Sequence, residues 1–138
     1  MLYQSALKTI VFTCSLAALA EQAPQISGWM KEANGAASTL RKLESKTGES
    51  AVDAAETLGG VYENMIGFWR SRNAADAVKW SEEGKAAALQ LANAAHAGNA
   101  ADAGAAFKTL MSTCQACHEA RREKLPDGGY RIKQPAAR

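Results

Sequence analysis

The sequence predicts an all-α protein folded as an antiparallel four-helix bundle. Alanine, the residue with the highest helix propensity, is the commonest residue of the chain, whereas proline occurs only 3 times in 138 residues. Hydrophobic residues also recur three and four positions apart in four segments, a spacing that gives a helix one apolar face. Because short connections make successive helices antiparallel, we expect the four helices to run up, down, up and down.

Composition narrows the classes of function. A hydrophobic content of 47% excludes a disordered chain, and 138 residues suit a single domain. The 16 Lys and Arg residues nearly balance the 14 Asp and Glu residues, which gives a formal charge of +2. A dedicated nucleic-acid binder would carry a basic stripe with aromatic residues, so we expect no nucleic-acid partner.

Residues 1–20 predict a secretory signal peptide. Lys8 is the only charged residue in this segment, an apolar run covers 10–20, and Ala18-Leu19-Ala20 is a small-residue cleavage pattern. The run is about 11 residues long, whereas a membrane span needs about 20. A membrane anchor or a first core helix is the alternative interpretation. We therefore expect export to the periplasm and a mature domain of residues 21–138 with no membrane span.

The first predicted helix covers about 24–46. Pro24 suits the first turn of a helix, because its missing N–H would have no partner there. The inward face that follows consists of Ile26, Trp29, Met30, Ala33, Ala37, Leu40 and Leu43. We expect the helix to end near Thr47-Gly48.

The second predicted helix covers about 50–70. Ser50, with Asp53 three residues later, is a weak variant of the capping box. The apolar positions then follow alternating steps of three and four: Ala51, Ala54, Leu58, Val61, Met65 and Phe68. Gly59-Gly60 in the middle of this helix indicates either a close approach of helices or a kink.

The third and fourth predicted helices cover about 73–97 and 101–124. Asn73 is expected to cap the third helix, which ends before Gly98-Asn99. Proline followed by Asp-Gly-Gly then ends the fourth helix, because these residues favour a turn. The basic tail, 125–138, has no predicted conformation beyond that turn.

The fourth segment contains the pentapeptide Cys114-Gln115-Ala116-Cys117-His118, the attachment signature of c-type haem. Two thiols three residues apart on one helical face can form thioethers to the two vinyl groups of a porphyrin. The histidine that follows can bind the iron through an imidazole nitrogen. At about 100° per residue these three side chains share the arc of the apolar residues Phe107, Leu110 and Met111, so we expect one covalent haem in the core.

Other uses of the C-x-x-C spacing fit less well. A closed zinc site needs four ligands, and in the mature chain only His96 could join Cys114, Cys117 and His118. A thioredoxin-like redox pair belongs to a βαβ context. A disulfide across one helical turn would add little stability because its loop is short.

The chain resembles the cytochromes c prime and their low-spin relatives, which are exported four-helix haem proteins. The resemblance rests on C-x-x-C-H in the last helix, followed by Arg122 and Lys124 in the family pattern C-x-x-C-H-x-x-x-R-x-K, and on the alanine-rich segment LQLANAAHAGN before it. It covers most of residues 21–124. The tail from Leu125 is longer than in many members, and the first helix has no arginine that aligns with one the family often carries. The resemblance is consistent with a homodimer through the first two helices.

The resemblance implies either an open sixth position on the iron or a methionine from the first helix. In an up-down-up-down bundle, Met30 and Met65 fall at the level of His118, so both are candidates, and Met30 is preferred. Met111 is about 10 Å along the same helix from His118, too far to oppose it. His96 falls at the opposite end of the bundle. A methionine that only packs against the porphyrin is the alternative.

Two arginines are candidate partners of a haem propionate, because a guanidinium can hold a carboxylate with two hydrogen bonds. Arg122 matches the family position, whereas Arg121 faces the core more directly by its helical angle. A solvated helix end, favoured by the helix dipole, is the alternative for both.

We therefore expect a carrier of single electrons with a redox protein as partner, because methionine and histidine ligation favours that role. A five-coordinate haem protein that binds a small gas such as nitric oxide is the alternative. We expect no enzymatic activity, since the sequence offers no general acid–base pair on the distal side.

Overall fold

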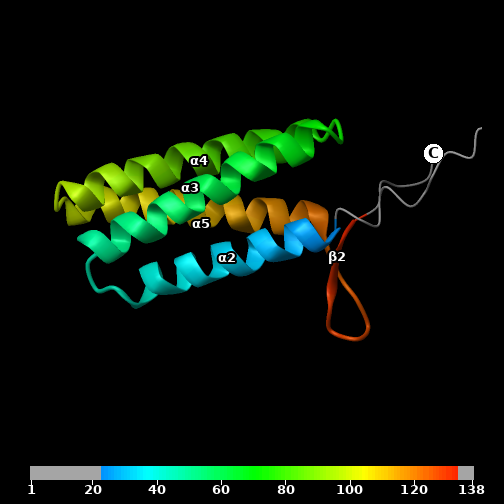
Figure 1. Cartoon of the computed structure of the whole chain (residues 1–138), viewed down its shortest axis with the longest axis horizontal. Coiled ribbons are helices and arrows are strands. Elements are labelled where there is room, and N and C mark those ends of the chain that lie inside the picture. The colour runs from blue at the N-terminus through cyan, green and yellow to red at the C-terminus, as the bar shows by residue number, and fades with distance from the viewer. Residues whose placement is uncertain (1–22, 134–138) are drawn as a thin grey trace, which may run out of the picture.

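The structure, a computed structural model, describes residues 23–133 and contains four long helices (Figure 1). They are α2 (Ala23–Lys42), α3 (Glu49–Arg70), α4 (Ala75–His96) and α5 (Ala100–Arg121). Helix α3 packs against α2 and α4, and α4 packs against α5, so helices adjacent in sequence are adjacent in space. The predicted all-α up-and-down four-helix bundle is confirmed. The predicted signal peptide, 1–20, lies outside the described residues.

The first helix ends earlier than predicted. Helix α2 ends at Lys42, and the segment that follows carries the chain across to α3. The Lys46 ammonium group donates a hydrogen bond of 2.7 Å to the Leu43 carbonyl, and the Gly48 N–H donates one of 3.2 Å to the Ala95 carbonyl at the end of α4. These bonds hold the segment after α2 in a loop and connect it to the end of α4, so the predicted extension of the first helix to residue 46 is wrong.

The predicted caps of the second and third helices are wrong. Helix α3 begins at Glu49 after Gly48, and within the described chain this N-terminus has no side-chain cap, so Ser50 does not cap it. Asn73 lies in a left-handed turn with φ 54°, and Ala74 occupies the position before α4. The side chain of Asn99 does cap α5, because it accepts a hydrogen bond of 3.1 Å from a backbone N–H in the first turn.

The end of the fourth helix differs most from the prediction. Helix α5 ends at Arg121, and the chain then forms an antiparallel hairpin of β1 (Arg122–Lys124) and β2 (Tyr130–Ile132). The predicted break lies at the turn of this hairpin, but pairing with β2 takes residues 122–124 from the helix. Lys133 N–H donates a hydrogen bond of 2.8 Å to the Arg121 carbonyl and holds the hairpin to the helix end.

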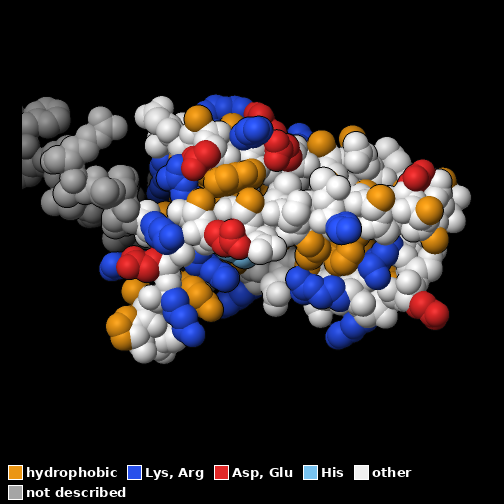
Figure 2. Space-filling view, turned by 180° about the vertical axis from the view of Figure 1, so that it is seen from behind, with side chains coloured by type: hydrophobic (Ala, Val, Ile, Leu, Met, Phe, Trp, Pro, Cys, Tyr) orange, Lys and Arg blue, Asp and Glu red, His pale blue; other side chains and the backbone are white. Residues whose placement is uncertain are grey.

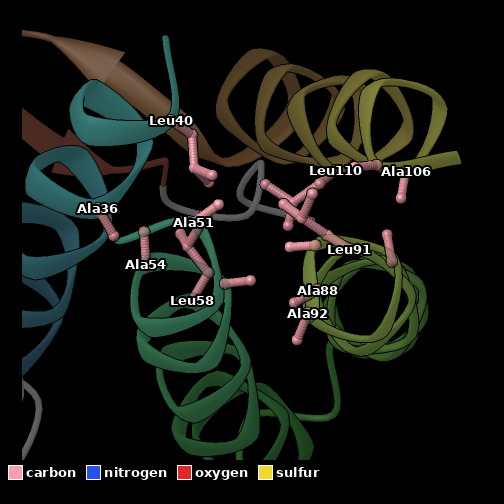
Figure 3. Close-up of a cluster of buried hydrophobic side chains, with 14 of the residues drawn as sticks. Ala36, Leu40, Ala51, Ala54, Leu58, Ala88, Leu91, Ala92, Ala106 and Leu110 are labelled. Carbon is pink, nitrogen blue, oxygen red and sulfur yellow. The ribbon is translucent and has the colours of Figure 1, made fainter. Parts of the chain in front are cut away.

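Four leucines form the centre of the core, one from each helix (Figure 3). Leu40, Leu58, Leu91 and Leu110 are at most 1% exposed. The side chains around them are mostly alanines, including Ala36, Ala51, Ala54, Ala88 and Ala92. Because alanine adds little bulk, the helices approach closely around this leucine layer, in agreement with the composition.

The core at the other end of the bundle is built differently. Its buried members come only from α3, α4 and the turn between them, and they form an aromatic cluster of Val61, Met65, Phe68, Trp69, Ala74 and Ala77. Helix α2 adds partly buried side chains to this cluster, whereas none of the described residues of α5 belongs to it. Helix α2 packs on α3 and, over the described residues, is not closely packed on α5. We call the interface between α2 and α5 the α2–α5 seam. The side chains that meet across it include Met30 with His118 and Arg41 with Met111.

The glycine that allows close packing is Gly84, not the predicted pair in α3. A Cβ at Gly59 would lie 3.9 Å from the Ala88 Cβ, an ordinary contact, and one at Gly60 would meet nothing within 4 Å. At Gly84 in α4, a Cβ would overlap the ring of Tyr62 and lie 2.8 Å from its Cδ1. The ring therefore rests directly on the backbone of α4.

Among the helices of residues 23–133, none has both the length and the apolar character needed to cross a membrane.

Candidate functional site

The C-x-x-C-H motif occupies the last two turns of α5. Cys117 is buried, whereas Cys114 and His118 are half-buried, and all three follow the inward arc predicted from helical spacing. Within residues 23–133 both cysteines are free. Burial raises the pKa of Cys117 to about 11, so this side chain is a neutral thiol at pH 7. The motif therefore offers two unpaired sulfurs and one imidazole on one helix face.

The structure brings Met30 and His118 together across the α2–α5 seam. The Met30 Sδ atom lies 3.5 Å from His118 Nε2, although 88 residues separate them in the sequence. Both side chains are half-buried, and they come from helices whose backbones are not closely packed. The seam therefore places a thioether and an imidazole face to face at the motif.

This pair fits two ligands of one metal after a small displacement. Bonds of about 2.3 Å to sulfur and about 2.0 Å to imidazole, as at zinc, would place opposed donor atoms about 4.3 Å apart. The observed separation is 3.5 Å, so the donors would have to part by about 0.8 Å. A planar macrocycle also needs room around the metal. The chemistry of the donor set, a thioether opposite an imidazole and beside two thiols, fits a haem iron, and α2 and α5 are not closely packed there.

Met65 is the second sequence candidate for the sixth position, whereas the sequence places Met111 and His96 too far from His118. Met65 is buried in the aromatic cluster at 5% exposure. The Met111 sulfur lies 3.5 Å from an amino group of Arg41, closer to the middle of the seam. His96 is exposed at the end of α4, the end of the bundle opposite the hairpin (Figure 1). Met30 is therefore the methionine that faces His118.

Long cationic side chains cover the seam away from the motif. The Lys46 ammonium group lies 5.4 Å from the centre of the half-buried Phe107 ring, and Arg41 reaches Met111. Figure 2 shows the same kind of arrangement over the rear of the molecule, where Lys and Arg side chains flank hydrophobic patches. Flexible side chains, rather than interlocked helix backbones, therefore close this part of the seam.

Aromatic rings line the motif end of the bundle. The Trp29 and Phe68 rings meet edge to face with centres 6.0 Å apart, and Phe68 and Trp69 do so at 4.9 Å. Among the described residues, the indole Nε1 of Trp69 is buried without a hydrogen-bond partner. A buried donor without an acceptor is costly, so this N–H is available to an acceptor that residues 23–133 do not supply.

The two candidate arginines lie in different surroundings. Arg121 forms an ion pair with Asp76 at the start of α4, and its guanidinium lies 5.9 Å from the centre of the Trp69 ring. Although partial burial raises the pKa of Asp76, hydrogen bonds from Arg121 and a backbone N–H outweigh it and leave the pKa lowered. Arg122 lies on β1 with its guanidinium 4.3 Å from the Tyr130 ring centre. Arg121 is thus the arginine beside the aromatic cluster.

The electrostatic surroundings favour a neutral His118. Burial, followed by repulsion from the Arg122 charge, lowers the pKa of His118 below its ordinary value of 6.5. A neutral imidazole has a free nitrogen lone pair, which is the form that binds metals.

A disulfide and a closed zinc site are two alternative uses of the C-x-x-C spacing. Cys114 and Cys117 are not joined in a disulfide in the described chain. Nor do residues 23–133 contain a group of three or more His, Cys, Asp or Glu side chains placed to hold a metal ion.

Sequence reasoning missed Tyr62, which touches the motif from α3. Its hydroxyl oxygen lies 3.1 Å from Cys114 Sγ and 2.8 Å from the hydroxyl of Thr113. Tyr62 is four residues after Leu58 and therefore on the apolar face of its helix, which is the one local signal for burial. No sequence spacing relates it to Cys114, because the two belong to different helices.

Comparison of the chain with protein-family models, with curated proteins and with solved structures found no match. The four-helix bundle is therefore established by the structure itself, and the resemblance to the cytochromes c prime stays a prediction.

Proposed function

We propose that this protein is an exported c-type haem protein of the cytochrome c prime kind that carries single electrons. The observation that carries the proposal is the opposition of Met30 Sδ and His118 Nε2 at 3.5 Å, directly beside the two free cysteines of a C-x-x-C-H motif. A packed bundle has no general need for a thioether to face an imidazole there. The coincidence with an attachment signature favours a haem.

Each residue has a defined task in this proposal. Cys114 and Cys117 would each hold the haem by adding a thiol across one vinyl double bond, with the thiol proton passing to the neighbouring vinyl carbon. His118 and Met30 would bind its iron through an imidazole nitrogen and a thioether sulfur. A covalently held haem with these ligands supplies one-electron chemistry at its iron, with a raised potential. Electron exchange then requires a redox protein as partner.

The surroundings of the motif support this task. The aromatic cluster excludes water from the Met30 side of the seam, which favours a stable methionine ligand. Arg121 and the Trp69 indole N–H are hydrogen-bond donors at the same end of the bundle, suited to the carboxylates of a haem. Export through residues 1–20 belongs to the proposal as well, since haem attachment of this type takes place outside the cytoplasm in bacteria.

The proposal is tested by absorption spectra of the oxidised and reduced protein, purified from an export-competent host. We expect a covalently bound, low-spin haem in the wild type and a high-spin haem in Met30→Ala. Met111→Ala is the matched control, because it removes another half-buried methionine of the seam and should leave the spectrum unchanged.

Three results would contradict the proposal at different points. A colourless exported protein whose two thiols both react would refute haem attachment altogether. A coloured protein whose spectrum does not change in Met30→Ala would refute methionine ligation. A high-spin wild type would favour the gas-binding alternative over electron transfer.

A further inference from the structure

Tyr62 is a buried phenol that contacts the first sulfur of the motif. Its side chain is 6% exposed in the middle of α3, and its hydroxyl lies between Cys114 Sγ at 3.1 Å and Thr113 Oγ1 at 2.8 Å. Burial is the main factor that raises the pKa of Tyr62 far above its usual range, so the phenol keeps its proton. A protonated hydroxyl therefore lies beside the sulfur of Cys114 and the oxygen of Thr113.

The surrounding hydrogen bonds determine which atoms donate. The Thr113 hydroxyl donates to the Leu110 carbonyl at 2.8 Å, so its oxygen is free to accept from Tyr62. The Tyr62 oxygen can then accept from the Cys114 thiol. A thioether has no S–H, so after attachment the sulfur can only accept. The Tyr62 O–H then lies between two acceptors, the hydroxyl of Thr113 and the bound sulfur.

The ring that carries this hydroxyl is held in place by α4. Gly84 leaves room for the ring where any Cβ would overlap it. The hydroxyl of the phenol contacts α5 through Thr113 and Cys114. The hydroxyl position is thus fixed by three helices, which gives a geometric constraint that a surface tyrosine would not provide.

We infer that Tyr62 is a positioning residue for the Cys114 edge of the attached haem, an inference that rests on the proposed function. Its hydroxyl shares its one proton between Thr113 and the Cys114 thioether sulfur and holds that edge against α3. The positive end of the O–H dipole also lies beside the haem, which gains an electron on reduction. The hydroxyl therefore stabilises the reduced state and raises the reduction potential.

The experiment compares reduction potentials of the exported, haem-loaded protein and three variants by redox titration. Tyr62→Phe removes the hydroxyl and keeps the ring, while Thr113 retains its bond to Leu110. Gly84→Ala keeps the hydroxyl but displaces the ring. Tyr130→Phe is the control, because Tyr130 is 55% exposed on the hairpin. Circular dichroism verifies that each variant is folded.

We expect a lower potential in Tyr62→Phe and in Gly84→Ala, with two thioethers retained, and an unchanged potential in Tyr130→Phe. A wild-type potential in Tyr62→Phe would overturn the inference, whatever Gly84→Ala does, because the hydroxyl would then have no effect. A wild type without haem would refute the proposed function itself, and the inference with it. The two failures are distinguishable by colour before any titration.

Discussion

Gly84→Ala tests the contact that fixes the α3–α4 packing. A Cβ at this position would overlap two ring carbons of Tyr62 and lie 2.8 Å from a third, whereas carbon atoms in contact prefer about 3.5–4.0 Å. The ring cannot move away freely, because its hydroxyl contacts Thr113 and Cys114. Overpacking of this kind costs about 1–3 kcal/mol.

A second glycine separates this cost from helix propensity. Alanine is about 1 kcal/mol more favourable than glycine within a helix. Gly60→Ala in α3 has open space around the new Cβ, so it should raise the free energy of unfolding by about 0.5–1 kcal/mol. Gly84→Ala gains the same helix propensity, but its new Cβ overlaps the Tyr62 ring. The Gly84→Ala variant should therefore be less stable than Gly60→Ala by about 1–3 kcal/mol.

The assay is urea unfolding monitored by circular dichroism at 222 nm, a wavelength that reports helix content. The dependence of the free energy of unfolding on urea concentration is compared between variants. Equal slopes mean that the midpoints report stability alone. Equal free energies of unfolding for the two variants would refute the packing argument, because they would show that the Tyr62 ring yields to a Cβ at no cost.

Two further predictions concern a cap and a titration. Asn99→Ala should lower the free energy of unfolding by about 1 kcal/mol, because a backbone N–H at the start of α5 loses its acceptor; unchanged urea unfolding would contradict this. In the haem-free chain, the lowered pKa of His118 means that the unfolded state takes up a proton first as the pH falls below 6.5. The contribution of His118 to the free energy of unfolding is therefore complete above pH 6.5. It decreases as the pH falls through the pKa that His118 has in the folded state. Arg122→Gln should raise the His118 pKa in an NMR titration, whereas an unchanged pKa would exclude the charge of Arg122 as a cause.

Local signals allowed much of the fold to be predicted. The four helices, their order and the break after α5 follow from hydrophobic periodicity and turn residues, which act over a few neighbouring positions. The helix face that carries the motif follows in the same way, because Cys114, Cys117 and His118 lie within about two turns of one helix. Helix ends were less predictable, since Asn73 and Ser50 are good capping residues that the loops place out of reach.

By itself, then, the sequence determined an all-α bundle with a C-x-x-C-H motif on the inward face of its last helix. It also offered Met30 as a candidate, but only by counting turns from the helix start. The tertiary structure decided that Met30 faces His118, that Arg121 pairs with Asp76, and that a hairpin replaces the last helical turn. The physical reason is that periodicity describes one helix at a time. Contacts between helices depend on how their side chains interlock, and no spacing along the chain specifies that register.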